Sequence, residues 1–298
     1  MLKKYLININ NELVGLRLDV AITKKVENMT RSFLKEHLKM LKVNDKNEKL
    51  SYKSKVGDIV YVEVEEVENI DITPEDIPLD IIYEDKNYIV INKPYGMVVH
   101  PAKGNYRGTL VNALMGLKKN LSNTGDVSRL GIVHRLDKDT SGLIIIAKNN
   151  QSHSYLQELF AKRMIIKRYH AIVKGFFSPS KITIENIIGR NPNNRKKMAV
   201  VASKGKIAIT QVVVRKRVKN YSYLNINLKT GRTHQIRVHL SHFGFPILGD
   251  PIYSRKDAKF KDIPLCLVAY RISFFDKFSN KQLEFRIDDP IHFKKILD

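Results

Sequence analysis

One stretch of this chain lacks positive charge entirely, and it constrains the fold more than any other feature. No Lys or Arg occurs between residues 61 and 83, although the 298 residues include 52 of them. The stretch instead contains acidic residues and two prolines: Glu63, Glu65, Glu66, Glu68, Asp71, Pro74, Glu75, Asp76, Pro78 and Asp80. Proline removes a backbone hydrogen-bond donor and like charges repel each other, so this composition is typical of a linker. We therefore expect a small domain at residues 1–70, an acidic linker at 71–80 and a larger domain at 81–298.

The positive charge of the chain is concentrated in one segment. The formal net charge is +22, but residues 1–70 contain 13 Lys or Arg against 11 Asp or Glu. Residues 161–240 contain 19 Lys or Arg and a single acidic residue, Glu185. A compositional drift toward Lys, Asn and Ile would raise the Lys content without concentrating it in this way. Clustered Lys and Arg neutralise phosphates, so the distribution favours a nucleic acid as the partner.

The composition disfavours several classes of protein. The only cysteine, Cys266, allows neither an intramolecular disulfide framework nor a cysteine-based zinc cluster. A membrane span needs about 18–20 apolar residues, whereas the longest apolar run here covers residues 143–147. At the N-terminus, polar residues interrupt any apolar core of a signal peptide. We therefore expect a cytoplasmic protein that is monomeric and has no membrane partner.

Two helices are predicted for the small domain. Apolar residues at helical spacing indicate one helix at residues 17–27, and Thr30 is a suitable N-cap for a second helix that extends to Leu41. The second helix would carry a basic stripe of residues four apart: Arg31, Lys35 and Lys39. An alternating pattern at residues 57–64 predicts a strand. The basic helix face fits a compact RNA-binding module, and it equally fits an ordinary solvated surface.

A tight polar loop before a core strand is the most unusual segment of the larger domain. The apolar residues 143–147 predict a buried strand, and polar residues precede it: His134, Arg135, Asp137 and Asp139. Polar groups beside a core strand are costly to desolvate unless they are paired, so such clusters often mark a functional site. Two structural roles are also open, namely Asx-type capping of a turn, which we assign to Asp139, and a salt-bridge network around Arg135.

Two further segments carry side chains suited to RNA. In a predicted strand at residues 165–174, Tyr169 follows two cations, which suits base stacking and phosphate contact, although a lone Tyr in a strand is commonly a core residue. Residues 224–228 predict another strand, which turns into a helix that ends near Gly244. The start of this helix is crowded with side chains that would form an anion site: Arg232, Thr233, His234, Gln235 and Arg237.

Neither a metal nor an organic cofactor is predicted. Four histidines could suggest a metal, but no helical pair at ligand spacing comes with a third ligand in register: His134, His234, His239 and His242. No P-loop and no dinucleotide-binding fingerprint occurs either. We therefore expect no cofactor.

Both predicted domains resemble known families. Residues of about 13–66 are similar to an S4-type RNA-binding domain, in the motifs Arg17-Leu18-Asp19, Thr30-Arg31-Ser32 and Lys55-Val56-Gly57-Asp58-Ile59-Val60. Residues of about 80–255 resemble a pseudouridine synthase of the RluA/RluD group, the branch that acts on large-subunit ribosomal RNA and carries an N-terminal S4 domain. The stretches that match lie at residues 92–101, 134–142, 167–169, 231–239 and 248–253.

The resemblance implies an α+β fold and an isomerase. The catalytic domain would have a mixed, mostly antiparallel sheet flanked by helices with a central cleft, next to a small S4 domain of the αL type. The enzyme would convert specific uridines in RNA to pseudouridine without a cofactor. A stem-loop of large-subunit ribosomal RNA is the expected substrate, and transfer RNA is an open alternative.

The resemblance also implies roles for individual residues. Asp137 would be the catalytic aspartate, and Arg237, in preference to Arg232, would be the guanidinium that favours its charged form. Tyr169 would stack on the target base and assist in removing its proton, and Ile236 would form an apolar wall beneath the base. The other candidates for contacts with the substrate are His134, Arg135, Arg232, Gln235, Arg31 and Lys35.

Two alternative functions are open at this point. Asp137 and Asp139 would share one face of an extended loop, as in a metal-dependent nuclease. The chain could also be an RNA-binding or ribosome-assembly factor without catalytic activity. The joint presence of Asp137, Tyr169 and the two arginines at 232 and 237 favours the enzyme over the binding factor.

Overall fold

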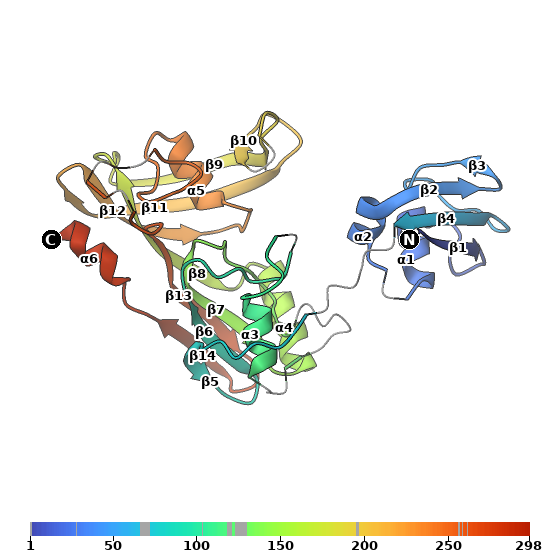
Figure 1. Ribbon diagram of the computed structural model, residues 1–298, viewed down its shortest axis with the longest axis horizontal. Coiled ribbons are helices and arrows are strands. Elements are labelled where there is room, and N and C mark those ends of the chain that lie inside the picture. Colours follow the sequence, from blue (N-terminus) through green and yellow to red (C-terminus); the bar gives the residue numbers. More distant parts are fainter. Residues whose placement is uncertain are drawn as a thin grey trace. The chain divides into compact units, whose positions relative to one another are not determined.

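The computed structural model describes residues 2–27, 29–65, 72–102, 104–117, 121–122, 130–194, 197–255, 257, 259–260 and 262–298. The chain divides into two units, Met1–Asp71 and Ile72–Asp298, whose elements are labelled in Figure 1. This division is close to the boundary expected near residue 70, and the acidic residues at 66–71 lie outside the described residues. No helix in the described part of the chain is long and apolar enough to cross a membrane.

The first unit is a small antiparallel sheet with two helices. Its elements are β1 (Leu2–Asn8), α1 (Leu18–Lys25), α2 (Arg31–His37), β2 (Leu38–Val43), β3 (Lys46–Asn47) and β4 (Ile59–Glu65). The strands pair in the order β1-β4-β2-β3. Val60, Val62 and Val64 alternate along β4 and are buried in one core with Leu18 and Leu34 of the helices. The strand predicted at residues 57–64 is thus confirmed, and its buried face is the one that meets the helices.

The second helix of this unit ends earlier than predicted. Thr30 caps it, since the Thr30 hydroxyl accepts the backbone N–H of Phe33, but the helix ends at His37 and β2 follows directly instead of a helix to Leu41. Pairing of β2 with β4 satisfies its backbone groups and buries two of its apolar side chains, which outweighs their helical spacing. Lys39 therefore lies on a strand, and the predicted basic stripe is reduced to two residues of α2.

The second unit is built on one mixed sheet. Its strands are β5 (Asp80–Glu84), β6 (Tyr88–Lys93), β7 (Ser141–Ala147), β8 (Ile166–Lys174), β9 (Lys181–Arg190), β10 (Met198–Val200), β11 (Lys206–Val218), β12 (Tyr221–Leu228), β13 (Leu267–Asp276) and β14 (Lys281–Arg286). They lie in the order β10-β9-β11-β12-β8-β13-β7-β6-β5, and β14 pairs with β13. Between the described strands, only the pairing of β13 with β7 is parallel. The sheet is therefore mixed and mostly antiparallel, as expected.

Helices cover this sheet, and two of them explain the apolar run in β7. The helices are α3 (Leu110–Gly116), α4 (Asn150–Ala161), α5 (Gln235–His242) and α6 (Ile291–Leu297). Leu143 and Ile145 of β7 pack in one cluster with α4, whereas Ile144 and Ile146 pack in another cluster with α3. A strand that is covered on both faces needs apolar side chains at every position. The segment before β7 is thereby attached to the centre of the core.

Residues 72–79, which we expected to belong to the linker, are part of the second unit. The backbone N–H of Glu75 donates to the carbonyl of Asn112 over 3.0 Å, and the Asn112 side chain donates to the carbonyl of Thr73 over 2.8 Å. Three apolar side chains of the segment pack against the cluster that contains α3: Ile72, Ile77 and Leu79. The acidic composition suggested a solvated segment, but these apolar side chains bind it to the helix.

Gly142 lies in β7 where that strand meets β13, and its substitution tests this packing. Its φ is +113°, and a Cβ would lie 2.5 Å from backbone atoms of Ala269. We expect Gly142→Ala to lower the free energy of unfolding by about 3–5 kcal/mol, since strained backbone and overpacking add together. In the matched control, Gly244→Ala, φ is +87° but the space is open. That control should cost only about 1–2 kcal/mol, and equal losses in urea unfolding would contradict the assigned crowding.

Candidate active site

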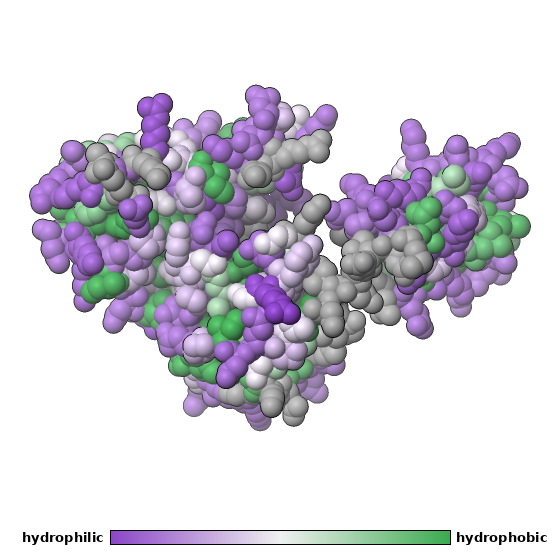
Figure 2. Space-filling model, in the orientation of Figure 1, coloured by the Kyte–Doolittle hydropathy of each residue, from purple (hydrophilic) through white to green (hydrophobic). Residues whose placement is uncertain are grey.

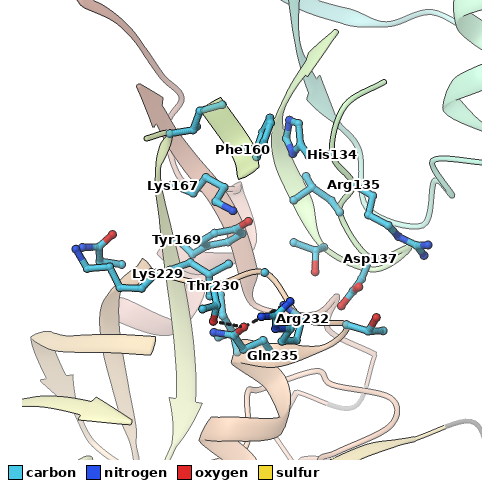
Figure 3. A pocket seen from close by; sticks show the side chains of 18 of the residues that line it. His134, Arg135, Asp137, Phe160, Lys167, Tyr169, Lys229, Thr230, Arg232 and Gln235 are labelled. Atoms are coloured by element: carbon cyan, nitrogen blue, oxygen red, sulfur yellow. Dashed lines mark hydrogen bonds between the residues drawn. The ribbon is translucent and has the colours of Figure 1, made fainter. Parts of the chain in front are cut away.

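A large cavity lies in the second unit between the loop before β7, strand β8 and the turn from β12 into α5 (Figure 3). Its volume is about 1000 Å³. All eight candidate residues that we predicted in the larger domain line it: His134, Arg135, Asp137, Tyr169, Arg232, Gln235, Ile236 and Arg237. The fold therefore gathers into one site residues as far apart in the sequence as His134 and Arg237.

Arg31 and Lys35 belong to the first unit and are not among the residues that line the cavity. Arg31 donates from Nη2 and Nε to Oδ2 of Asp19 over 2.5 and 3.2 Å, and Arg17 donates to the same carboxylate. The hydrogen bond from Arg17 and then that from Arg31 lower the pKa of Asp19, although burial acts in the opposite direction. Arg31 is thus ion-paired, Lys35 is exposed, and contact of either with RNA stays a prediction.

An ion pair between Asp137 and Arg237 forms the centre of the cavity. Nη1 of Arg237 lies 3.3 Å from Oδ2 of Asp137, which confirms the predicted pairing and the preference for Arg237 over Arg232. The side chain of Arg237 is 2% exposed and that of Asp137 is 20% exposed. Oδ1 of Asp137 has no hydrogen-bond partner among the described residues. The Asp137 carboxylate is therefore held by a buried cation through one oxygen and is accessible from the cavity.

A second carboxylate, that of Asp250, fixes the orientation of Arg237. Nε and Nη2 of Arg237 donate to its two oxygens over 2.8 and 2.9 Å, and the Asp250 side chain is completely buried. Oδ1 of Asp250 also accepts the backbone N–H groups of Ile252 and Tyr253. Burial alone would lower the pKa of Arg237, but the hydrogen bonds and charge of Asp250, followed by those of Asp137, raise it above its usual value. Sequence reasoning noted the stretch at 248–253 but gave Asp250 no role.

Gln235 sets the turn from β12 into α5. Its Nε2 donates to the carbonyl of Ile209 and to the hydroxyl of Thr210 over 3.1 and 2.9 Å. Its Oε1 accepts the hydroxyl of Thr230 and the backbone N–H of Arg232 over 2.8 and 3.0 Å. These four bonds use the full hydrogen-bonding capacity of a buried amide. The side chain thus ties the turn to β11, and a contact of Gln235 with the substrate stays a prediction.

His234, immediately before α5, is the other imidazole of the site. Its backbone is left-handed, with φ of 55°, and its Nδ1 forms a hydrogen bond of 2.9 Å with the hydroxyl of Tyr253. Its Nε2 lies 3.9 Å from Oδ2 of Asp137. Burial lowers the pKa of His234 below its usual value despite the nearby carboxylate, so the imidazole is neutral at pH 7. The sequence suggested an anion site or a metal ligand here, not a neighbour of Asp137.

Tyr169 and Ile236 form the apolar side of the cavity. Both are buried, and both belong to one core cluster with Leu136. Burial, and to a lesser degree the charge of Asp137, raises the pKa of Tyr169 above its usual value, so its hydroxyl is protonated at neutral pH. The ring extends from β8 into the cavity, and its hydroxyl has no hydrogen-bond partner among the described residues (Figure 3). A bound group would meet an aromatic ring and a neutral hydroxyl.

His134 fastens the loop of Asp137 to the core. Its Nε2 accepts the backbone N–H of Ile145 over 3.0 Å, and its ring stacks on that of Phe160 at 4.7 Å between centroids. Burial, followed by the charge of Lys167, lowers the pKa of His134 to about 3. A neutral imidazole bonded to the backbone in this way positions the loop. A contact of His134 with RNA stays a prediction.

Lys93 also holds the loop that carries Asp137, a role that the sequence did not indicate. Its buried ammonium group donates over 2.8, 2.8 and 3.1 Å to three backbone carbonyls, those of Pro94, Met97 and Lys138. Burial lowers the pKa of Lys93 to about 8, against the opposing charges of Asp139 and Asp137. The only sequence feature that could have pointed to Lys93 is its place in the stretch at residues 92–101, which resembles the family.

Cations dominate the lining of the cavity. Arg135 and Arg163 are exposed, and Arg232 donates from Nε to the carbonyl of Ile207 over 3.0 Å. Among the described residues the lining has one acidic residue, Asp137, and seven basic ones: Arg135, Arg163, Lys167, Arg168, Lys229, Arg232 and Arg237. Such an excess of positive charge suits a polyanion.

Asp139, the second carboxylate of the loop, does not line the cavity. The predicted Asx-type cap is replaced by a backbone bond, in which the N–H of Thr140 donates to the carbonyl of Asp137 over 3.2 Å. In the part of the chain that the structure describes, no group of three or more His, Cys, Asp or Glu is placed to hold a metal ion. Asp137 and Asp139 thus do not present two carboxylates to one cavity, as a two-metal nuclease would require.

Asp250→Asn tests whether the buried pair supports the site. We expect this substitution to lower the free energy of unfolding by about 3–5 kcal/mol, because it removes the buried carboxylate beside Arg237 and leaves only the partly exposed Asp137 to compensate that charge. Glu158→Gln, which removes an exposed ion pair with Lys162, is the control and should leave the stability nearly unchanged. Urea unfolding measures both variants. Equal, small losses would show that Asp250 does not hold the cation.

Comparisons with known proteins match the chain to one family. Residues 87–242 match the family model described as RNA pseudouridylate synthase. The chain is 38% identical over 297 residues to ribosomal large subunit pseudouridine synthase D of Zymomonas mobilis, covering 95% of this chain and 93% of that protein. It is 40% identical to the protein of the same name from Neisseria meningitidis serogroup A, covering 96% of this chain and 80% of that one.

Two solved human structures share the fold. RNA pseudouridylate synthase domain containing 1 has a TM-score of 0.58 and 25% identity, and the match covers 76% of this chain and 87% of that one. RNA pseudouridylate synthase domain containing 4 has a TM-score of 0.57 and 29% identity over 73% of this chain and 91% of that one. The family model, the relatives and the shared fold show that the chain belongs to the RNA pseudouridylate synthase family and is an isomerase of the RluA type.

Proposed function

We propose that this enzyme converts uridines of large-subunit ribosomal RNA to pseudouridine, with Asp137 as its catalytic carboxylate. The observation that supports the catalytic assignment is the accessible carboxylate of Asp137, held 3.3 Å from a fixed cation inside a positively charged cavity. Ribosomal RNA is proposed from the relatives, because two proteins named ribosomal large subunit pseudouridine synthase D are 38% and 40% identical to this chain over most of its length.

The reaction exchanges one bond of the nucleoside for another. The glycosidic bond between C1′ of the ribose and N1 of the uracil breaks, the uracil turns, and C1′ bonds to C5. A proton leaves C5 and N1 gains one, so the reaction consumes no electrons and no energy donor. The first step requires an ionised carboxylate at the target nucleoside. Asp137 would supply it, since Arg237 engages Oδ2 and leaves Oδ1 available.

Tyr169 and Ile236 would hold the base while it turns. A flat ring and an apolar wall contact a base in more than one orientation, whereas directional hydrogen bonds would have to break during the rotation. The Tyr169 hydroxyl is protonated at neutral pH because burial raises its pKa. Such a hydroxyl would assist as a relay, accepting the C5 proton while it passes its own proton to water, in agreement with the role that the family resemblance implies.

The positive lining would help to extract the target nucleotide from its stack. An enzyme that acts on a base pays a few kcal/mol for unstacking, and contacts between phosphates and cations offset that cost. The exposed basic residues of the lining, such as Arg135 and Arg163, would provide such contacts. The visible face of the second unit is also mainly hydrophilic, with only scattered apolar side chains (Figure 2).

Asp137→Ala tests the catalytic assignment. We expect a loss of at least about 10⁴-fold in kcat, because no other carboxylate of the cavity can replace it. Affinity for RNA should change little, since the lost group carries no positive charge. Carbodiimide mapping of pseudouridines in ribosomal and transfer RNA measures both the activity and the choice of substrate.

Asp139→Ala is the matched control, because Asp139 lies on the same loop but outside the cavity. This variant should remain active. Pseudouridine formation by the Asp137→Ala enzyme would overturn its catalytic role. Modified sites in transfer RNA alone would overturn the proposed substrate.

We also propose that the first unit is an S4-type RNA-binding domain. Two of the motifs that resemble this family meet in the structure, because Asp19 pairs with both Arg17 and Arg31. Two guanidinium groups on one carboxylate leave a net positive charge at the start of α2, where Lys35 is also exposed. This cluster supports a contact with RNA phosphates at that end of the helix.

Removal of residues 1–71 separates RNA binding from the chemistry. We expect the affinity for RNA to fall about 10- to 100-fold, since one of two linked binding surfaces is lost. Turnover at saturating RNA should persist, because every residue that lines the cavity belongs to the second unit. Gel-shift titration and kinetics on a minimal stem-loop measure the two effects. Complete loss of turnover at saturation would contradict the assignment.

A further inference from the structure

Lys167 is a cation of the cavity for which no described residue supplies an anion. It lies two residues before Tyr169 on β8, so both side chains point to the same face of the strand and into the cavity (Figure 3). Its ammonium group makes no hydrogen bond and no ion pair with a described residue. Its neighbours are the ring of Phe160, whose centroid is 5.4 Å from Nζ, and Gly231.

Two other partly or fully buried lysines of this unit show which bonding partners a buried ammonium group normally has. Lys93 donates to three backbone carbonyls, and Lys148 forms an ion pair of 2.8 Å with Glu84. An ammonium group withdrawn from water without such partners is costly. The cost is visible at Lys167, where burial lowers the pKa below its usual value.

No described carboxylate of the cavity pairs with this ammonium group. The one acidic residue of the described lining, Asp137, is bonded to Arg237 and forms no ion pair with Lys167. An anion brought by the ligand would supply the partner that Lys167 lacks.

The space around the ammonium group is open to such an anion. Position 231 is a glycine, and even a Cβ there would stay 3.6 Å from Nζ of Lys167. The neighbouring side chain of Thr230 is turned away, since its hydroxyl donates to Gln235. With a volume of about 1000 Å³, the cavity is at the upper end of the usual range for small-ligand sites, about 300–1000 Å³. It therefore has room for the sugar and phosphate of a nucleotide as well as its base.

We propose that Lys167 binds a backbone phosphate of the RNA adjacent to the target uridine. This inference rests on the proposed function, because it requires the uridine to enter this cavity. The phosphate is the group of an RNA chain that carries a full negative charge, and an everted nucleotide brings its own phosphates within a few bonds of its ribose. A neutral uracil carbonyl at the same place would leave the ammonium charge uncompensated.

The test compares Lys167→Met, which removes the charge at similar length, with Lys167→Arg, which keeps it. The measured quantity is kcat/KM for a ribosomal RNA stem-loop across a series of salt concentrations. We expect Lys167→Met to lower kcat/KM about 10- to 100-fold, mainly through KM, as for a lost hydrogen bond to a charged group. The slope of log kcat/KM against log salt should become shallower by about 0.7, the value for one phosphate contact on a single strand. Lys167→Arg should restore the wild-type slope.

Lys281→Met is the matched control, since Lys281 is exposed on β14 and does not line the cavity. It removes the same charge elsewhere and should leave the slope unchanged. Thermal unfolding shows that each variant is folded, and Lys167→Gln replaces the Met variant if that one is not.

A wild-type slope in the Met variant, with kcat reduced, would show that the ammonium group acts on the base or on the fold, and the inference would be wrong. Failure of Lys167→Arg to restore the slope in a folded protein would have the same meaning. If the wild-type enzyme itself forms no pseudouridine in the stem-loop, the proposed function fails, and this inference fails with it.

Discussion

The buried pair of Arg237 and Asp250 is the interaction on which the active site depends. A guanidinium group that is 2% exposed requires a carboxylate beside it, and Asp250 provides two hydrogen bonds while two backbone N–H groups fix its own position. Only then can the remaining side of Arg237 meet Asp137 at 3.3 Å. Two carboxylates thus share one cation, and the group of three carries a net charge of about −1. Arg237 orients Asp137 without cancelling its charge, which fits the catalytic role proposed for that carboxylate.

Two further side chains fix the loop of Asp137 through hydrogen bonds to backbone groups and leave the cavity free. His134 accepts an N–H group of β7, the strand covered by α4 on one face and by α3 on the other. Lys93 donates to a carbonyl of the loop itself, that of Lys138. Because both anchors lie in the core, a displacement of Asp137 would require the core to move, and protein interiors resist such shifts. The position of the carboxylate is therefore set before RNA binds, as efficient catalysis requires.

The sequence predicted the ion pair at the centre of the cavity better than the hydrogen bonds that support it. The apolar run of β7 and the pairing of Asp137 with Arg237 were predicted correctly, the first from composition and the second through family resemblance. Contacts of Gln235 and His134 with RNA stay predictions, and the sequence could not show their bonds to the backbone, because a polar side chain in a motif looks the same whether it faces a ligand or a backbone group. Only the fold shows that the carbonyl of Ile209 and the N–H of Ile145 lie within reach of them. The predicted linker failed for a similar reason: its acidic residues are visible in the sequence, but the surface of α3 that receives its apolar ones is not.

The excess of positive charge in the cavity has a consequence for how RNA binding is driven. Six of the seven basic residues in the lining come from the segment 161–240, where most of the net charge of +22 is found. In the free enzyme these cations repel one another, and among them only Arg237 has a carboxylate partner in the lining. Phosphates that enter the cavity remove this repulsion in addition to forming their own contacts, so part of the affinity comes from strain that the free enzyme already contains. The first unit, with 13 basic and 11 acidic residues in positions 1–70, has little such repulsion to relieve. The RNA contact proposed for this unit would therefore depend on local geometry around Arg17 and Arg31, whereas the excess of positive charge lies at the cavity of the second unit.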